Sequence, residues 1–454
     1  MSENTTMHNL SPDPLLSSFL LKTSVIMEDQ FQPAGRPRRN ALERLRHRFY
    51  EPLFFLNILN PATGGHGAYS GHALRSCVRL VEWRSFLDSL AWLCDAKHGG
   101  KTVSALVGSR VEDGVRFILC SSHQNGKIHL HQVLDIITKA NQEPSPPNDL
   151  GMQSKLIDLC INFSADKIRT YKRRLQRLLG AIRDHIGPDA SNALGSIGNR
   201  DKSPMETCCE ANKFPHRKIL KEANDRPNCS LRIISKIVLA LHFVSKLSKW
   251  HRVVPKLLGF ARRHSYLLQN ASCEWLKLSE RTTMPSADEK TTVQSALRRM
   301  LPKEAQTQVS ELQNHLHLQR DGKFEEYFIA NYSDANLSLV AHAEVVLLEH
   351  VYDHDIRLVE DDRYIGCSKP SCYCCDLYMK YHPGDFVPRP SHGNVYVTWN
   401  FPLLPTCTNP KVYEHTLQVM NQVIQHVRRD VFRVVKNTSG RWEKAPDSAS
   451  GICT

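Results

Sequence analysis

Two short motifs in the last third of the 454-residue chain restrict its fold more than any other feature. One is an H-x-E at residues 342–344, and the other is a C-x-x-C at residues 372–375. At this composition, chance gives about one H-x-E and about half a C-x-x-C per chain, so neither motif is informative alone. Among 22 His and 14 Cys there is one of each, and the H-x-E precedes the C-x-x-C by about thirty residues.

The residue types in these motifs suit one catalytic zinc ion. Cys372 and Cys375 are three positions apart, so on one helix their sulfurs point to the same side. A position at a helix N-terminus favours the thiolate over the thiol. With His342 they make three ligands, which leaves the fourth tetrahedral position open to water. Glu344 is placed to take a proton from that water and pass it to the leaving group of a substrate. We therefore predict a Zn²⁺ site with Glu344 as the catalytic proton shuttle.

The pattern around the motifs alternates between strand and helix. It predicts an α/β layered fold for the last third of the chain. We expect strands at 325–332, 363–366 and 394–399, helices at 339–350, 372–380 and 411–427, and an edge strand at 431–435.

These residues resemble the cytidine-deaminase-like superfamily and, within it, the fungal OTT_1508-like predicted deaminases. The resemblance spans about residues 340–402 and includes Tyr-Ile-Gly-Cys-Ser-Lys at 364–369 and Ser-His-Gly at 391–393. It implies a three-layer α/β/α fold, one catalytic zinc ion and hydrolytic removal of an exocyclic amine from a nucleobase. The superfamily has Pro directly before the first Cys, whereas here Ser371 intervenes. We expect Ser371 to cap the helix instead.

The resemblance also bears on the first part of the chain, because a helix and a hairpin normally precede the H-x-E helix in that superfamily. Helical spacing at 85–94, followed by two apolar runs within 102–121, has this order. The basic helical stretch at 124–322 is then an insertion into the catalytic domain. The alternative is a separate helical domain, with 325–332 as the local strand.

The expected organisation has four parts. They are a mobile tail at 1–40, a mostly helical basic region at 41–322, a catalytic core at 323–436 and a second tail at 437–454. The basic region includes the deaminase-like helix and hairpin at 81–121 and a linker at 187–228.

Charge is concentrated in the first part of the chain. Residues 336–435 carry 9 basic and 11 acidic side chains, although the whole chain has a net charge of +13. The densest basic runs are at 36–39, 167–177 and 216–221. We expect this region to contact nucleic acid, and the alternative is a set of solvated helix faces. Protein partners cannot be identified from the pattern.

Composition excludes several other classes of protein. The apolar fraction of 41% and the charged fraction of 23% are those of a globular protein, not of a disordered or fibrous one. The longest apolar stretch, 231–247, is interrupted by Lys, Arg and His, so we expect no membrane span. No secretory signal is evident, and the irregular cysteine spacing favours reduced thiols. We expect an intracellular protein, cytoplasmic or nuclear.

The predicted function is hydrolysis of an amidine-type C–N bond in a nucleobase, within a nucleic acid. One alternative is a deaminase of a free nucleoside or base. Another is an inactive zinc-bearing scaffold that binds nucleic acid or protein. A structural zinc site with Cys374 or Cys367 as fourth ligand, and a redox C-x-x-C, are further readings of the cysteines.

Four residues near the motifs are candidates for the pocket wall: Ser371, Tyr373, His392 and Trp399. Trp399 lies on an expected strand, where a tryptophan more often packs into the core than stacks on a base.

Overall fold

The computed structural model of the chain describes residues 41–59, 77–100, 102–142, 150–215, 230–402 and 410–436. The predicted tails at 1–40 and 437–454 and the basic runs at 36–39 and 216–221 lie outside these residues. Residues 1–44 and 45–454 form separate units. Of the first unit, residues 41–44 are described, as the start of helix α2 (Ala41–Leu59). The account below concerns the second.

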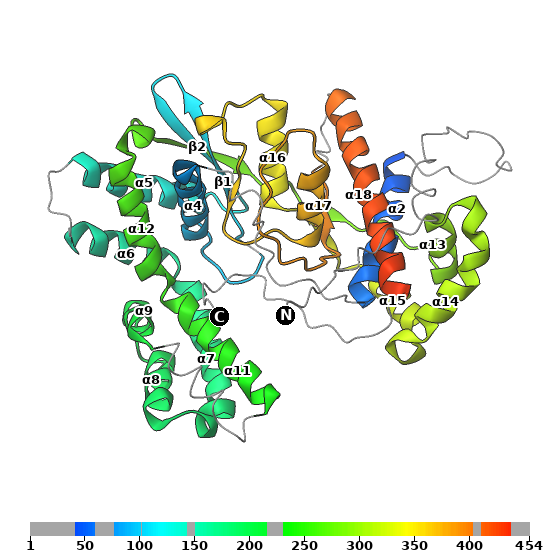
Figure 1. The fold of residues 1–454 in the computed structure, drawn as a ribbon, viewed down its shortest axis with the longest axis horizontal. Coiled ribbons are helices and arrows are strands. Elements are labelled where there is room, and N and C mark those ends of the chain that lie inside the picture. The colour runs from blue at the N-terminus through cyan, green and yellow to red at the C-terminus, as the bar shows by residue number, and fades with distance from the viewer. Residues whose placement is uncertain are drawn as a thin grey trace, which may run out of the picture. The chain divides into compact units, whose positions relative to one another are not determined.

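A four-stranded sheet lies at the centre of the fold (Figure 1). The predicted hairpin is present as β1 (Ala105–Val111) and β2 (Gly114–Ser121), which pair antiparallel. Strand β3 (Ser272–Lys277) runs parallel to β2, and the short β6 (Gly366–Cys367) runs antiparallel to β1. The hairpin therefore pairs directly with the strand that precedes the second motif.

Helices from distant parts of the chain pack on this hairpin. Alternate hairpin residues, including Leu106, Phe117 and Leu119, belong to one large hydrophobic core with helices α4 (Val78–Leu93) and α5 (Asn125–Gln142). Helix α16 (Ala343–Asp353), which carries Glu344, also packs against β1 and β2, and none of its residues belongs to that core. The fold is thus of the α/β type, with additional helical regions.

A second, three-stranded sheet leads into the first motif. Its order is β4 (Thr282–Thr283), β5 (Ser338–Ala341) and β7 (Trp399–Asn400). β5 runs parallel to β7 and continues straight into α16. Tyr50 of α2 anchors this sheet, because its hydroxyl donates a hydrogen bond of 3.0 Å to the Trp399 carbonyl. The expected helix at 339–350 consequently begins only at Ala343, and the expected strand at 394–399 is reduced to β7.

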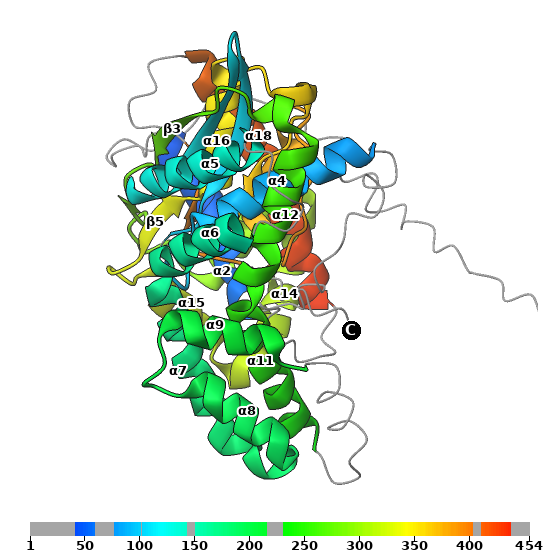
Figure 2. The same ribbon diagram turned by 90° about the vertical axis from the view of Figure 1, so that its left-hand side faces the viewer.

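The basic helical region adds a layer of helices to the same large core (Figures 1 and 2). Its helices are α6 (Leu150–Phe163), α7 (Ala165–Ile182), α8 (Pro188–Gly198), α9 (Pro204–Lys213), α11 (Leu231–Leu247) and α12 (Lys249–Arg263). Figure 2 shows α7, α8, α9 and α11 grouped together in the lower part of the view.

The predicted linker at 187–228 is wrong for its described part, which contains α8 and α9. Both helices begin with Pro in the first turn, and Ser203 forms a capping box with Glu206 at the start of α9. Leu194 and Ile197 of α8 are buried in the core. The prediction relied on the Gly, Ser and Asn content of this segment. It missed two short amphipathic helices because each has only a few buried apolar positions.

Two predicted strands are also wrong. Residues 325–332 lie in helix α15 (Phe324–Tyr332), and 431–435 lie in helix α18 (Pro410–Lys436). In α15 the buried Phe324, Phe328 and Tyr332 follow the four-residue spacing of one helix face. In short apolar runs this spacing is easily mistaken for the alternation of a strand.

The remaining elements complete the second unit. They are α13 (Val293–Met300), α14 (Val309–His317), α17 (Tyr373–Tyr381) and the 3-10 turns η1 (Arg183–His185), η2 (Ser265–Leu268), η3 (Lys303–Gln308), η4 (Gln319–Gly322) and η5 (Val359–Asp361). Within the described part of the chain, every helix is too short or too polar to cross a membrane.

Helix α4 packs on β6 so closely that only glycine fits there. A Cβ at Gly366 would lie 2.6 Å from the backbone carbon of Leu87. Helix α4 is thus in contact with β6, the strand before Cys372, as the insertion hypothesis requires. The domain boundaries themselves stay a proposal.

We predict that Gly366→Ala destabilises the protein by about 1–3 kcal/mol, because either backbone must move to admit the methyl group. Gly180→Ala is the matched control, since nothing lies within 4 Å of the added carbon and the site is on α7. It should raise stability by roughly 0.5–1 kcal/mol. Urea unfolding measures both. Equal effects of the two substitutions would contradict the close α4–β6 contact.

Candidate metal centre and substrate cavity

The candidate ligands lie at the starts of two adjacent helices. His342 is the N-cap of α16, and Cys372 is the N-cap of α17, with Cys375 in its first turn. The Nδ1 atom of His342 is 3.5 Å from the Cys372 Sγ and 3.3 Å from the Cys375 Sγ. Two helix N-termini therefore direct their partial positive charge towards the sulfurs, which favours thiolates.

This geometry suits a tetrahedral zinc ion. With Zn–S bonds of about 2.3 Å and Zn–N bonds of about 2.0 Å, the ligand atoms of a tetrahedron lie roughly 3.5 Å apart. The three candidate ligand atoms all lie within 4.8 Å of one another, and neither Cys374 nor Cys367 belongs to their group among the described residues. Thiolate and imidazole are also the donors that zinc prefers. The residues thus fit a three-ligand site.

The group is strongly polarised by burial and mutual charge. Burial raises the pKa of Cys375 well above its ordinary value. Burial also acts to raise the pKa of Cys372, but its hydrogen bond with Cys375 and the charge of His342 hold that pKa well below its ordinary value. Burial acts to lower the pKa of His342, yet the negative Cys372 outweighs it and raises the pKa to about 9. Both shifts favour the charged forms of Cys372 and His342.

Trp399 supports one of the candidate ligands from the core. Its side chain is fully buried, and its indole Nε1 donates a hydrogen bond of 3.1 Å to the Cys375 Sγ. A donor to a ligand sulfur orients that ligand and stabilises its negative charge. Trp399 therefore lies in the core, as considered from the sequence, and it also supports Cys375.

Glu344 is buried beside the candidate ligands. Its side chain lies on the first turn of α16, and the residue is 3% exposed. Its Oε2 atom is buried and has no hydrogen-bond partner among the described residues. A buried carboxylate oxygen without a donor is costly, so such an atom commonly has a bound water or substrate as its partner.

A cavity of about 480 Å³ opens onto this cluster. His342, Glu344 and Cys372 line one side, and the chain segment 277–281, which joins β3 to β4, lines another. This volume is in the range of small-molecule binding sites. The segment 277–281 comes from the region predicted to be an insertion.

The four predicted pocket residues have different positions. Of them, His392 lines the cavity. The Tyr373 hydroxyl instead donates a hydrogen bond of 2.7 Å to Asp430 of α18. Ser371 does not cap α17 as expected, since Cys372 is the N-cap and the Ser371 Oγ is buried without a partner among the described residues. Its backbone pairs with Ser391 instead.

Several cavity residues were missed from the sequence. Tyr396 lies with its ring centre 6.1 Å from that of His342, and Lys277, Arg281 and Lys369 add positive charge to the wall. The basic bias of residues 1–335 was the one sequence signal for two of them. Their proximity to the motifs arises from contacts that are distant in sequence.

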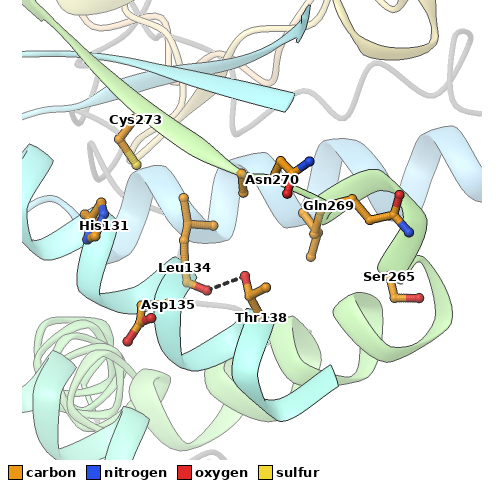
Figure 3. A pocket seen from close by; sticks show the side chains of 10 residues that line it. His131, Leu134, Asp135, Thr138, Ser265, Gln269, Asn270 and Cys273 are labelled. Atoms are coloured by element: carbon orange, nitrogen blue, oxygen red, sulfur yellow. Dashed lines mark hydrogen bonds between the residues drawn. The ribbon is translucent and has the colours of Figure 1, made fainter. Parts of the chain in front are cut away.

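A second cavity, of about 520 Å³, lies between α5 and the segment leading into β3 (Figure 3). His131, Asp135 and Cys273 line it, and Thr138 bonds back to the Leu134 carbonyl at 2.7 Å. His131 and Asp135 are exposed, and the candidate metal ligands do not line this cavity. It is therefore a surface groove without a built polar site.

A His/Cys/Cys group beside a buried glutamate, in an α/β fold, defines a candidate metallohydrolase centre. Residues 341–403 match the family model of the OTT_1508-like deaminases. The resemblance inferred from the sequence is thus confirmed, and this segment is similar to that family. The fungal origin stays a prediction. No curated protein and no solved structure matches the chain.

We predict that Cys375→Ala removes one zinc ion per chain, because two ligands hold zinc far more weakly than three. Cys374→Ala deletes the same atom from the adjacent buried residue and should leave the zinc in place. Elemental analysis gives the content, and Co²⁺ substitution shows whether the thiolate-to-metal charge-transfer band disappears. An unchanged band in Cys375→Ala would rule out this ligand set.

Proposed function

We propose that the chain is a zinc-dependent hydrolytic deaminase that acts on a nucleobase, with a nucleic acid as its substrate. The observation that carries this proposal is the buried, unpartnered oxygen of Glu344, which lies beside the three candidate ligands and lines the cavity. The deaminase family match supports the reaction class.

His342, Cys372 and Cys375 are the residues that would hold the zinc. When bound, zinc supplies a Lewis acid that makes water nucleophilic near neutral pH. Glu344 takes a proton from the attacking water and delivers it to the ring nitrogen, and a second transfer protonates the leaving amine. The water oxygen replaces the exocyclic nitrogen, and ammonia leaves, so the reaction is a redox-neutral hydrolysis.

The cavity walls offer a place for the base itself. His392 and Tyr396 lie edge to face, with ring centres 5.9 Å apart. His392 is held in place because its Nδ1 accepts a hydrogen bond of 3.1 Å from the Asn394 amide. Aromatic walls stack on a nucleobase and exclude water from the reacting atoms.

Cations in the cavity wall support a nucleic-acid substrate over a free nucleoside. Lys277 and Arg281 are exposed, and Lys369 donates a hydrogen bond of 2.8 Å to the Gly99 carbonyl. Glu280 pairs with Lys277 at 3.7 Å in an exposed contact, which has little energetic weight. The two exposed cations are placed to contact the phosphates that flank an inserted base.

We predict that Glu344→Gln lowers kcat by about 10²–10⁴-fold while the zinc content is unchanged, because the amide cannot accept the proton. Glu280→Gln removes a carboxylate from the same cavity wall and should leave kcat within about twofold, since it is exposed. Ammonia release measures both variants. Full activity in Glu344→Gln would overturn the mechanism. If the unmutated, zinc-loaded protein deaminates no base, the alternative of an inactive zinc-bearing scaffold is favoured.

We predict that activity on a single strand falls steeply with salt, whereas activity on a nucleoside changes little. Replacing Lys277 and Arg281 by Ala should reduce the slope of log kcat/KM against log salt by about 1.4, or about 0.7 per phosphate contact. Lys139→Ala/Lys155→Ala changes the same charge at exposed positions on α5 and α6 and should keep the slope. Equal salt dependence for strand and nucleoside would favour the free-nucleoside alternative.

A further inference from the structure

A second cluster of metal-binding side chains lies where α16, α17 and α18 meet. Glu349 is near the end of α16, His382 is the C-cap of α17, and His415 lies on α18. The Nε2 atoms of the two histidines are 3.0 Å apart. The Glu349 Oε1 is 3.3 Å from the His382 Nε2 and 3.6 Å from the His415 Nε2. Three potential ligand atoms thus converge from three helices.

This triangle has the dimensions of one face of a metal coordination shell. Metal–ligand bonds of about 2.1 Å at angles of 90–110° put ligand atoms roughly 3.0–3.5 Å apart. Two imidazoles and one carboxylate are the donors of many sites for divalent transition metals. The cluster is also buried, since Glu349 is 6% and His382 5% exposed.

Hydrogen bonding leaves one carboxylate oxygen of this cluster without a partner among the described residues. The Tyr378 hydroxyl donates a hydrogen bond of 2.6 Å to the Glu349 Oε1. The Glu349 Oε2 is buried and has no partner among the described residues. His382 and His415 both hydrogen-bond to the Glu349 carboxylate. A cation in the triangle would interact favourably with all three groups at once.

Aromatic side chains hold both imidazoles in this arrangement. The Tyr352 ring stacks on His415, with centres 5.0 Å apart, and meets His382 edge-on at 4.8 Å. Phe386 also packs edge-on against His382, with ring centres 5.7 Å apart. Rings fixed in this way lose little freedom when they bind a ligand.

One hydrogen bond, from the Gly384 amide to His382, has to break before His382 can coordinate a metal through Nε2. The Gly384 amide donates a hydrogen bond of 3.0 Å to the His382 Nδ1, which places the ring proton on Nε2 in the metal-free protein. Coordination through Nε2 requires this proton to move to Nδ1 and the Gly384 amide to turn away. Metal therefore binds at the expense of this one hydrogen bond.

We infer that Glu349, His382 and His415 form a second metal site, which takes a divalent transition metal ion such as Zn²⁺ or Co²⁺. The site is separate from the candidate catalytic group, which lies at the opposite ends of α16 and α17. A metal here ties the ends of both helices to α18. It thereby stabilises the helices that position the candidate catalytic group.

The test uses full-length Cys375→Ala protein, so that the first site is disabled. After chelator treatment, titration with Co²⁺ should load one ion per chain, without a thiolate charge-transfer band. The melting temperature should rise with metal concentration, because the ion binds the folded state. A folded Cys375→Ala protein that binds no Co²⁺ would overturn the inference. Failure of the deaminase proposal would leave this result unchanged.

Two further variants assign the ion to the cluster. Adding His415→Ala should abolish Co²⁺ binding, whereas adding His354→Ala, which removes an exposed imidazole near the end of α16, should keep it. Glu349→Gln preserves side-chain size if His415→Ala does not fold, and should weaken binding at least about tenfold. Retained binding in Glu349→Gln and His415→Ala alike would place the ion elsewhere and overturn the assignment.

Discussion

The ion pair between the buried Arg389 and the partly exposed Asp88 joins the two parts of the sequence on which the site depends. Its Nη1–Oδ1 distance is 2.7 Å, and Arg389 is 3% exposed. Arg389 also donates to the carbonyls of Ile365, Cys367 and Lys369, while Asp88 accepts the Cys367 amide at 2.9 Å. Without Asp88, the buried guanidinium of Arg389 would lose its carboxylate partner, which is unfavourable for a charge removed from water. Helix α4 and the segment before Cys372 are therefore held as one structure.

Two helices, α16 and α17, position the candidate ligands. α16 and α17 start at the three candidate ligands and end at the Glu349 cluster, so their axes relate the two groups of donors. Trp399 adds a donor to Cys375 from the sheet behind them. Since each contact comes from a different element, small displacements of one helix would separate the ligand atoms. Burial around both ends opposes such displacements.

The motifs were the most predictable feature, because their chemistry is local. Cys372 and Cys375 share one helical turn whatever surrounds them, and the hairpin at 102–121 follows from its own apolar runs. Residues 325–332 and the helices α8 and α9 were predicted wrongly, because short apolar patterns fit more than one structure until packing selects one. The Glu349 cluster had no local signature, since its members are 33 residues apart at each step.

By itself the sequence determined the donor types, their spacing along the chain, the deaminase resemblance and the uneven charge. These depend on residue identity and on contacts within a few positions. Tertiary structure alone decided which distant segments meet: that α4 packs on β6, that residues 277–281 line the cavity, and that α18 completes the second cluster. Such contacts result from burying apolar faces against each other, a collective effect that no single segment encodes.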